Sequence, residues 1–169
     1  MESHLRPQLA AARLRAWLES NAARHGADEA PGAGAVEVER LAARLGLSVA
    51  EFAPRFQPAG TLGYLEPGED LIFLRRGLSG AIRRFTLAHE LGHAVLHRAS
   101  GAASEHIRAA LGEDLGLGDA DAPLCAARDL DAPLDLLGMS DEQLAPGQAY
   151  SARSRREMQA NAFAAALLL

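Results

Sequence analysis

One segment constrains the fold of this chain more than any other, because it combines a helical pattern of apolar residues with two histidines four positions apart. The pattern predicts a helix from about Ala81 to Ala99, with His89 and His93 on one face, a turn apart. Two imidazoles placed in this way can bind one tetrahedral metal ion. Glu90 follows the first histidine and projects to the side, where its carboxylate can accept a proton from water without binding the metal.

A catalytic zinc ion needs a third protein ligand and an open position, so this hypothesis requires another donor. A histidine at position 99 would complete a metzincin pattern, but the chain has Ala99 there. His97 lies one turn beyond His93, yet three ligands in a row on one straight helix converge poorly on one ion. We therefore expect His97 to support the site. We predict Glu157 as the third ligand, and Asn161, one turn later, can hydrogen-bond to a ligand histidine.

Two segments, Arg84 to His93 and Glu157 to Ala165, together resemble the ImmA/IrrE metallopeptidases and occur in the order found in that family. The resemblance implies a thermolysin-like active site, in which the two histidines and Glu157 bind the metal and Glu90 is the catalytic base. It implies Zn²⁺ as cofactor, with another divalent metal such as Mn²⁺ as the alternative. It also implies a cytoplasmic endopeptidase that cleaves a partner protein, commonly a helix-turn-helix transcriptional repressor, as part of a stress response.

The rest of the chain predicts an α+β fold: helices packed on a small, mostly antiparallel sheet in a zincin-like metallopeptidase domain. Apolar residues at helical spacing predict helices that end near Gly26 and at Gly46. Residues 61–65 and 70–74 are rich in strand formers and flank a turn sequence, which predicts a β-hairpin. We expect the histidine helix to lie beneath the sheet and a helix within residues 151–169 to cross nearby.

Length and composition favour one domain. The chain has 169 residues, 49% of them hydrophobic, so it can bury one sizeable core, and we expect residues 1–169 to form a single metallopeptidase domain. Residues from about 101 to 149 are acidic and rich in Gly and Pro, which predicts an insertion. A terminal run of three leucines without a helix cap suggests further domains of a longer chain, or docking on a partner.

Composition also argues against several other classes of protein. The formal net charge of -5 argues against a surface that coats nucleic acid or seeks anionic membranes. No apolar run approaches the roughly 20 residues that span a bilayer, so we expect no membrane association. Cys125 is the only cysteine, which excludes an internal disulfide and fits a reducing, cytoplasmic setting.

Two parts of the predicted site stay open. The group that stabilises the oxyanion is not fixed by spacing; the side chains with suitable chemistry are Tyr150, His97, His106, Arg153, Arg155 and Arg156. The hairpin within residues 61–74 is the candidate for binding the substrate backbone by strand addition, and a purely structural hairpin is the alternative.

Two functions of other classes also stay open. A regulatory pseudo-peptidase would keep the metal and recognise a repressor without cutting it. A DNA-binding module is the second, because Leu41 to Ser48 looks like the first helix and turn of a helix-turn-helix. Its recognition helix would contain Glu51 and stop near Pro54, so we do not expect direct binding to nucleic acid.

Overall fold

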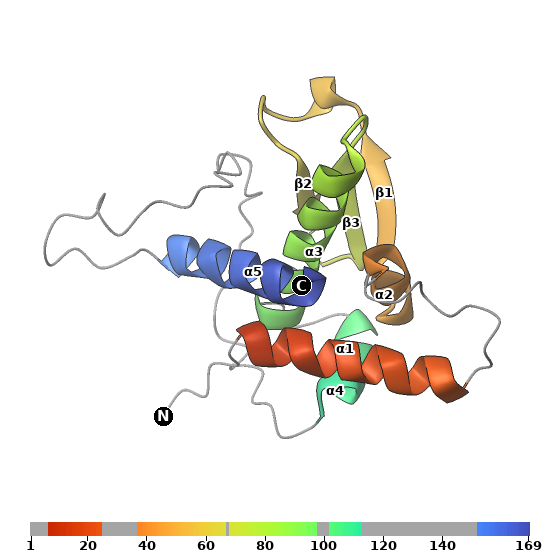
Figure 1. Cartoon of the computed structure of the whole chain (residues 1–169). Coiled ribbons are helices and arrows are strands. Elements are labelled where there is room, and N and C mark those ends of the chain that lie inside the picture. Colours follow the sequence, from red (N-terminus) through yellow and green to blue (C-terminus); the bar gives the residue numbers. More distant parts are fainter. Residues whose placement is uncertain (1–6, 25–36, 67, 98–101, 113–151) are drawn as a thin grey trace, which may run out of the picture.

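The computed structural model describes residues 7–24, 37–66, 68–97, 102–112 and 152–169. Its elements, labelled in Figure 1, follow in the order α1 (Pro7–Arg24), α2 (Val38–Arg44), β1 (Ser48–Phe52), the short 3-10 helix η2 (Pro54–Phe56), β2 (Gly63–Leu65), β3 (Leu71–Arg75), α3 (Gly80–His97), α4 (Ala102–Leu111) and α5 (Ala152–Leu168). Helices therefore pack on one small sheet, and the predicted α+β class is confirmed.

The sheet has the strand order β1-β3-β2. β2 and β3 form the predicted antiparallel hairpin, whereas β1 pairs with β3 in parallel. After β1 the chain passes through η2 to the far edge of the sheet, so β2 returns there and the hairpin places β3 in the middle (Figure 1). The sheet is therefore mixed, and the expected antiparallel pairing holds for one of its two strand pairs.

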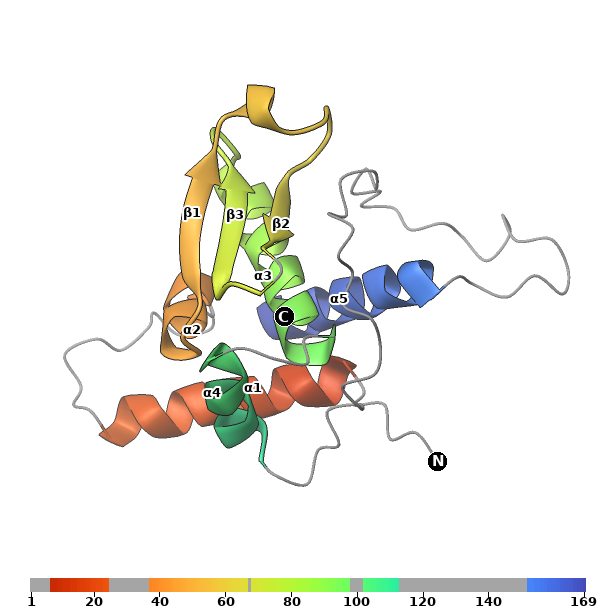
Figure 2. The same ribbon diagram turned by 180° about the vertical axis from the view of Figure 1, so that it is seen from behind.

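Helix α3 covers one face of the sheet. Ile72 and Leu74 alternate with half-exposed residues along β3 and are fully buried in the core. Leu87 and Leu91 of α3 are buried in the same cluster. Seen from behind, the sheet lies in front of α3, so the histidine helix lies against the sheet as expected (Figure 2).

A second group of helices covers α3 away from the sheet. α5 packs extensively along α3, and α1 packs against both α5 and α4 (Figure 1). Every helix labelled α contributes to one hydrophobic cluster; its members include Leu14, Leu41, Leu91, Ile107 and Phe163. The two helices that carry the candidate site are therefore fixed by one shared core.

The segment expected as an insertion begins with α4. Ala103, Ile107 and Leu111 of this helix are buried in the core, and the Asp70 carboxylate in the hairpin turn accepts a hydrogen bond from the Ala103 backbone N–H at 3.1 Å. The start of the segment is thus part of the packed domain. The remainder from residue 113 on, including Cys125, lies outside the residues that the structure describes, as does Tyr150.

The structure also bears on the DNA-binding alternative and on membrane-spanning helices. Residues 48–52, which would belong to the recognition helix of a helix-turn-helix, form strand β1 instead. That alternative therefore lacks the element that would enter a DNA groove. Among the described residues, no helix is both long and apolar enough to cross a membrane.

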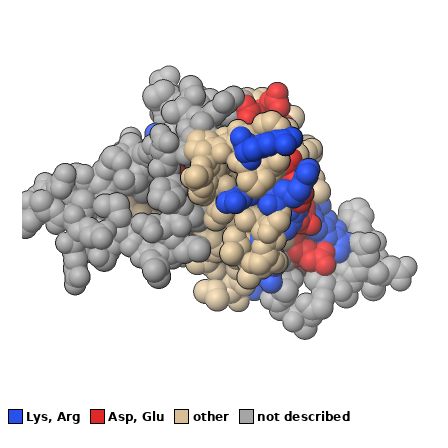
Figure 3. All heavy atoms as spheres, turned by 90° about the horizontal axis from the view of Figure 1, so that it is seen from above, with Lys and Arg blue, Asp and Glu red and all other residues tan. Residues whose placement is uncertain are grey.

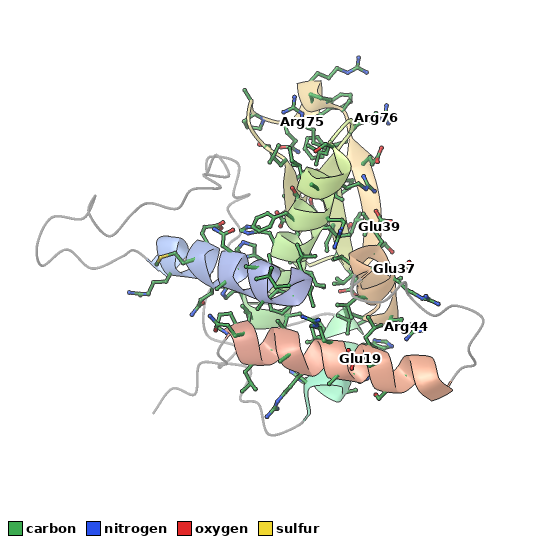
Figure 4. All side chains as sticks on the ribbon, viewed as in Figure 1. Glu19, Glu37, Glu39, Arg44, Arg75 and Arg76 are labelled. Carbon is green, nitrogen blue, oxygen red and sulfur yellow. The ribbon has the colours of Figure 1, made fainter. Side chains whose placement is uncertain are left out.

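Charged side chains link α3 to its neighbours at the surface. Basic side chains gather at the end of the molecule seen in Figure 3, and Arg75 and Arg76 lie there at the end of β3 (Figure 4). Arg83 of α3 donates to Glu39 of α2 at 2.9 Å and to Glu51 of β1 at 2.7 Å. These contacts are exposed, so each contributes little stability, but they help to set the position of α3.

Candidate metal centre

The site forms where α3 and α5 cross. A Cβ atom added to Gly92 of α3 would lie 3.0 Å from Phe163 Cδ1 and 3.2 Å from the Cα atom of Ala160, both on α5. A glycine at this position lets the two backbones approach closely. His89 and His93 flank this crossing on α3, and Glu157 projects from α5 toward them.

Three ligand atoms from the two helices converge. His89 Nε2 lies 3.1 Å from Glu157 Oε2, His93 Nε2 lies 3.3 Å from Glu157 Oε1, and the two Nε2 atoms are 3.1 Å apart. Ligands at about 2.0–2.1 Å from a tetrahedral zinc ion lie about 3.3 Å from one another. The group therefore has the spacing of a metal ligand set and can hold an ion.

The proton of His89 is fixed by an amide from α5. His89 Nδ1 lies 2.8 Å from the side-chain oxygen of Asn161. Because an amide oxygen only accepts, Nδ1 carries the hydrogen and Nε2 presents its lone pair to the centre. The predicted hydrogen bond between Asn161 and a histidine of the pair is confirmed.

His97 contacts His93 on the side of the ring away from the centre, and it contributes no atom to the converging ligand group. Its Nδ1 lies 3.1 Å from His93 Nδ1, and its Nε2 lies 2.9 Å from Gln159 Oε1 on α5. Burial lowers the pKa of His97 to about 4, helped by the charges of His93 and Arg156 and opposed by the hydrogen bond to Gln159. A neutral His97 can accept a hydrogen bond from His93.

The electrostatics of the group favour a cation at its centre. Burial alone would raise the pKa of Glu157, but its contacts with His89 and His93 outweigh this and hold the pKa well below its usual range. Burial alone would lower the pKa of His89, but Glu157 and Glu90 raise it above its ordinary value. Glu157 Oε1 is buried and accepts no hydrogen bond from the described residues. Two lone pairs and a carboxylate facing one point fit a divalent metal.

Comparison with known protein families adds an independent finding. Residues 53–113 match the family model Peptidase_M78, the IrrE N-terminal-like domain. This part of the chain is therefore similar to the M78 peptidases. The match confirms the resemblance to the ImmA/IrrE proteins and includes the segment that carries His89, Glu90 and His93. The match ends before α5, so the assignment of Glu157 as a candidate ligand depends on the distances given above. The comparisons with curated proteins and with solved structures gave no match.

Within the M78 segment, Glu90 lies beside the converging ligands without being one of them. Its side chain is 6% exposed, and its negative charge contributes to the raised pKa of His89. Glu90 therefore places a buried negative charge close enough to His89 to affect the pKa of that ring.

The oxyanion candidates are distributed unevenly around the site. Arg156 lies close enough to His97 for its charge to lower the pKa of that histidine. Arg155, on the same helix, is exposed. His106 lies on α4 with its ring near Gly46, at the end of α2, and hydrogen-bonds weakly to the Ala102 carbonyl at 3.4 Å. Tyr150 and the side chain of Arg153 lie outside the described part of the chain.

Sequence reasoning missed two residues that shape the site. Gly92 has a visible signal, because a glycine inside a confident helix costs about 1 kcal/mol relative to alanine and so indicates close packing. Gln159 has no such signal. A polar residue two positions after Glu157 is as common on an exposed helical face as in a site.

Proposed function

We propose that this chain is a zinc-dependent endopeptidase that hydrolyses a partner protein. The family match and the ligand group support a metallopeptidase-type function. The observation that carries the proposal is the convergence of two imidazoles from α3 and one carboxylate from α5 on one point. That arrangement supplies three protein ligands and leaves the fourth position of a tetrahedral ion for substrate chemistry.

Zinc is the metal that the donor set favours. Two imidazole nitrogens and one carboxylate are a common catalytic zinc set, whereas manganese prefers more oxygen ligands in octahedral geometry. When bound, zinc would polarise the substrate carbonyl and make water a stronger nucleophile at neutral pH. Mn²⁺ is the alternative that metal analysis must test.

Residues of the chain itself transfer the proton from the attacking water to the leaving amine. Glu90 takes a proton from the water that attacks the peptide carbonyl carbon, and it passes that proton to the amine nitrogen as the C–N bond breaks. Asn161 holds His89 in the tautomer that the site needs. Among the described oxyanion candidates, Arg156 is the arginine whose charge reaches His97 beside the ligand group.

The substrate backbone would add to β2. Among the residues that the structure describes, this strand pairs only with β3 and so forms an edge of the sheet. Gly63 of β2 packs tightly on Thr86 of α3, where an added Cβ would lie 2.7 Å from the Thr86 methyl group. Thr86 precedes His89 by less than one helical turn, so an extended peptide on this edge would run close to Glu90.

The partner that we propose is a helix-turn-helix transcriptional repressor in the cytoplasm, cut within a stress response. The peptidase family implies a protein substrate, and the repressor follows from the likeness to ImmA/IrrE proteins. A pseudo-peptidase that binds the repressor without cutting it has the same ligand group. The two functions differ only in whether Glu90 is used.

Metal analysis of the purified chain tests the centre. Wild-type protein should contain about one zinc per chain, and Glu157→Ala should lose it. Glu19→Ala is the matched control, because Glu19 is exposed on α1 (Figure 4) and should leave the metal content unchanged. Stoichiometric zinc in Glu157→Ala would remove this residue from the centre.

A cleavage assay tests the reaction. Candidate repressors and an unfolded protein such as casein are incubated with wild-type chain, with chelator-treated chain and with Glu90→Gln. We expect cleavage only by the metal-loaded wild type, while Glu90→Gln keeps its zinc. Zinc-loaded wild type that binds a repressor but cuts none of these proteins would instead support the pseudo-peptidase.

A further inference from the structure

A chain of hydrogen bonds connects α5 to the second candidate ligand. Gln159 Oε1 lies 2.9 Å from His97 Nε2, and His97 Nδ1 lies 3.1 Å from His93 Nδ1. On its other side, His93 Nε2 faces His89 and Glu157. Two histidine side chains thus lie in sequence between a glutamine on α5 and the point where the ligand atoms converge.

The direction of the protons along this chain follows from its first member. Gln159 Oε1 can only accept, so His97 carries its hydrogen on Nε2. The Nδ1 atom of this neutral ring is then an acceptor, and His93 must donate to it from Nδ1. His93 Nε2 is left with a lone pair aimed at the centre, which is the form that a metal requires.

The opposite orientation of the amide would reverse every step. If the Gln159 nitrogen faced His97, it would donate to Nε2, and His97 would donate from Nδ1 to His93. The hydrogen of His93 would then lie on Nε2, pointing at the centre and competing with a metal. One amide group therefore selects between a binding and a non-binding tautomer of a residue it does not touch.

We propose that Gln159, acting through His97, is a positioning residue that sets the tautomer of His93 for metal binding. This inference rests on the metal centre proposed above. It also gives α5 a consistent role, because the same helix provides the carboxylate ligand and, through Asn161, the amide oxygen that sets the tautomer of His89. Each histidine of the pair is thus oriented by an amide oxygen of α5, directly for His89 and through one ring for His93.

Zinc affinity of variants tests the inference without reference to activity. Gln159→Leu removes the acceptor, and we expect zinc affinity, measured by competition with a chromophoric chelator, to fall 10–100-fold. Gln159→Glu offers only acceptor oxygens, so it should keep the wild-type affinity within about threefold. Gln8→Leu, the same change at an exposed site on α1, is the matched control and should bind as wild type does. Wild-type affinity in Gln159→Leu, or an equal loss in Gln159→Glu, would overturn the proposal.

A measurement on the wild-type chain covers the case in which a variant fails to fold. Long-range ¹H–¹⁵N correlation spectra of the zinc-free protein at pH 7 report which ring nitrogen carries hydrogen. We expect His97 to be protonated at Nε2 and bare at Nδ1, and the opposite tautomer would refute the proposal. If wild-type protein binds no zinc, the proposed function fails, while this tautomer still tests the hydrogen-bond chain on its own.

Discussion

The substitution Gly92→Ala should disturb the metal centre through backbone packing alone, without changing a ligand. The new Cβ would lie 3.0 Å from Phe163 Cδ1 and 3.2 Å from both the Cα and the carbonyl oxygen of Ala160. Ordinary van der Waals contact begins at 3.4 Å. Phe163 and Ala160 are fully buried, and the Ala160 atoms belong to the backbone, so the clash is relieved mainly by moving α5.

The required movement is comparable with the tolerance of the site. Restoring normal carbon contacts of about 3.4–4.0 Å needs a shift of α5 by about 0.4–1 Å. Metal–ligand distances tolerate about 0.2 Å, and functional constellations about 0.5 Å. Because Glu157 moves with α5, we expect zinc affinity to fall at least tenfold. Overpacking costs about 1–3 kcal/mol, and the gain in helix propensity returns about 1 kcal/mol, so stability should fall by at most about 2 kcal/mol.

Chelator competition measures the zinc affinity, and urea denaturation of zinc-free protein measures the stability. Gly80→Ala is the matched control: it makes the same change in the same helix, where an added Cβ meets nothing within 4 Å. That variant should bind zinc normally and be no less stable than wild type. If Gly92→Ala behaved like Gly80→Ala in both assays, the close crossing of α3 and α5 would not be what positions Glu157.

Three further substitutions or conditions test separate contacts. Asn161→Leu should weaken zinc binding 10–100-fold in the chelator assay, because His89 Nδ1 loses its acceptor, whereas Asn161→Asp should retain it. The zinc-free protein should lose stability as pH falls from 6.5 toward 4, because the folded pKa of His97, about 4, lies below its unfolded value. His97 accounts for at most about 2 kcal/mol of this loss at pH 5. Urea denaturation of His97→Leu should show a loss of stability that is smaller by this amount. The raised pKa of His89 acts with the opposite sign: its contribution is complete below pH 6.5 and is lost as pH rises through the folded pKa, so it does not cancel the acid effect. Arg83→Ala should cost less than about 1 kcal/mol in urea denaturation, and less still in high salt, because its partners Glu39 and Glu51 are exposed; a larger, salt-independent loss would contradict this.

The parts of the fold that depend on local signals could be predicted from the sequence. The hairpin between β2 and β3 follows from two strand-forming segments around a four-residue turn, and α3 follows from its apolar spacing. The parallel pairing of Val49 with Ile72 has no local signal, because it depends on how the chain between them crosses the sheet. That pairing makes the sheet mixed.

The candidate site divides in the same way. His89 and His93 are recognisable because their spacing matches one turn of a helix. Glu157 lies on another helix, and a second motif with Asn161 indicated it. The orientation of Gln159 toward His97 depends on the angle and distance at which α5 crosses α3, which no residue spacing encodes. Gln159 therefore could not be identified as a site residue from the sequence.

The crossing also explains how the fold can hold the ligand atoms close together without a cation. Two imidazole nitrogens and a carboxylate lie about 3 Å apart, and the contacts of Glu157 with the two histidines favour close approach of α3 and α5. Burial of Phe163 and Leu167 against the core, and the contact of Ala160 with Gly92, favour that approach. Apolar packing therefore holds the ligands in place before the metal binds, and metal binding then stabilises the same helix pair, by about 2.7 kcal/mol when free metal is at 100 times its dissociation constant.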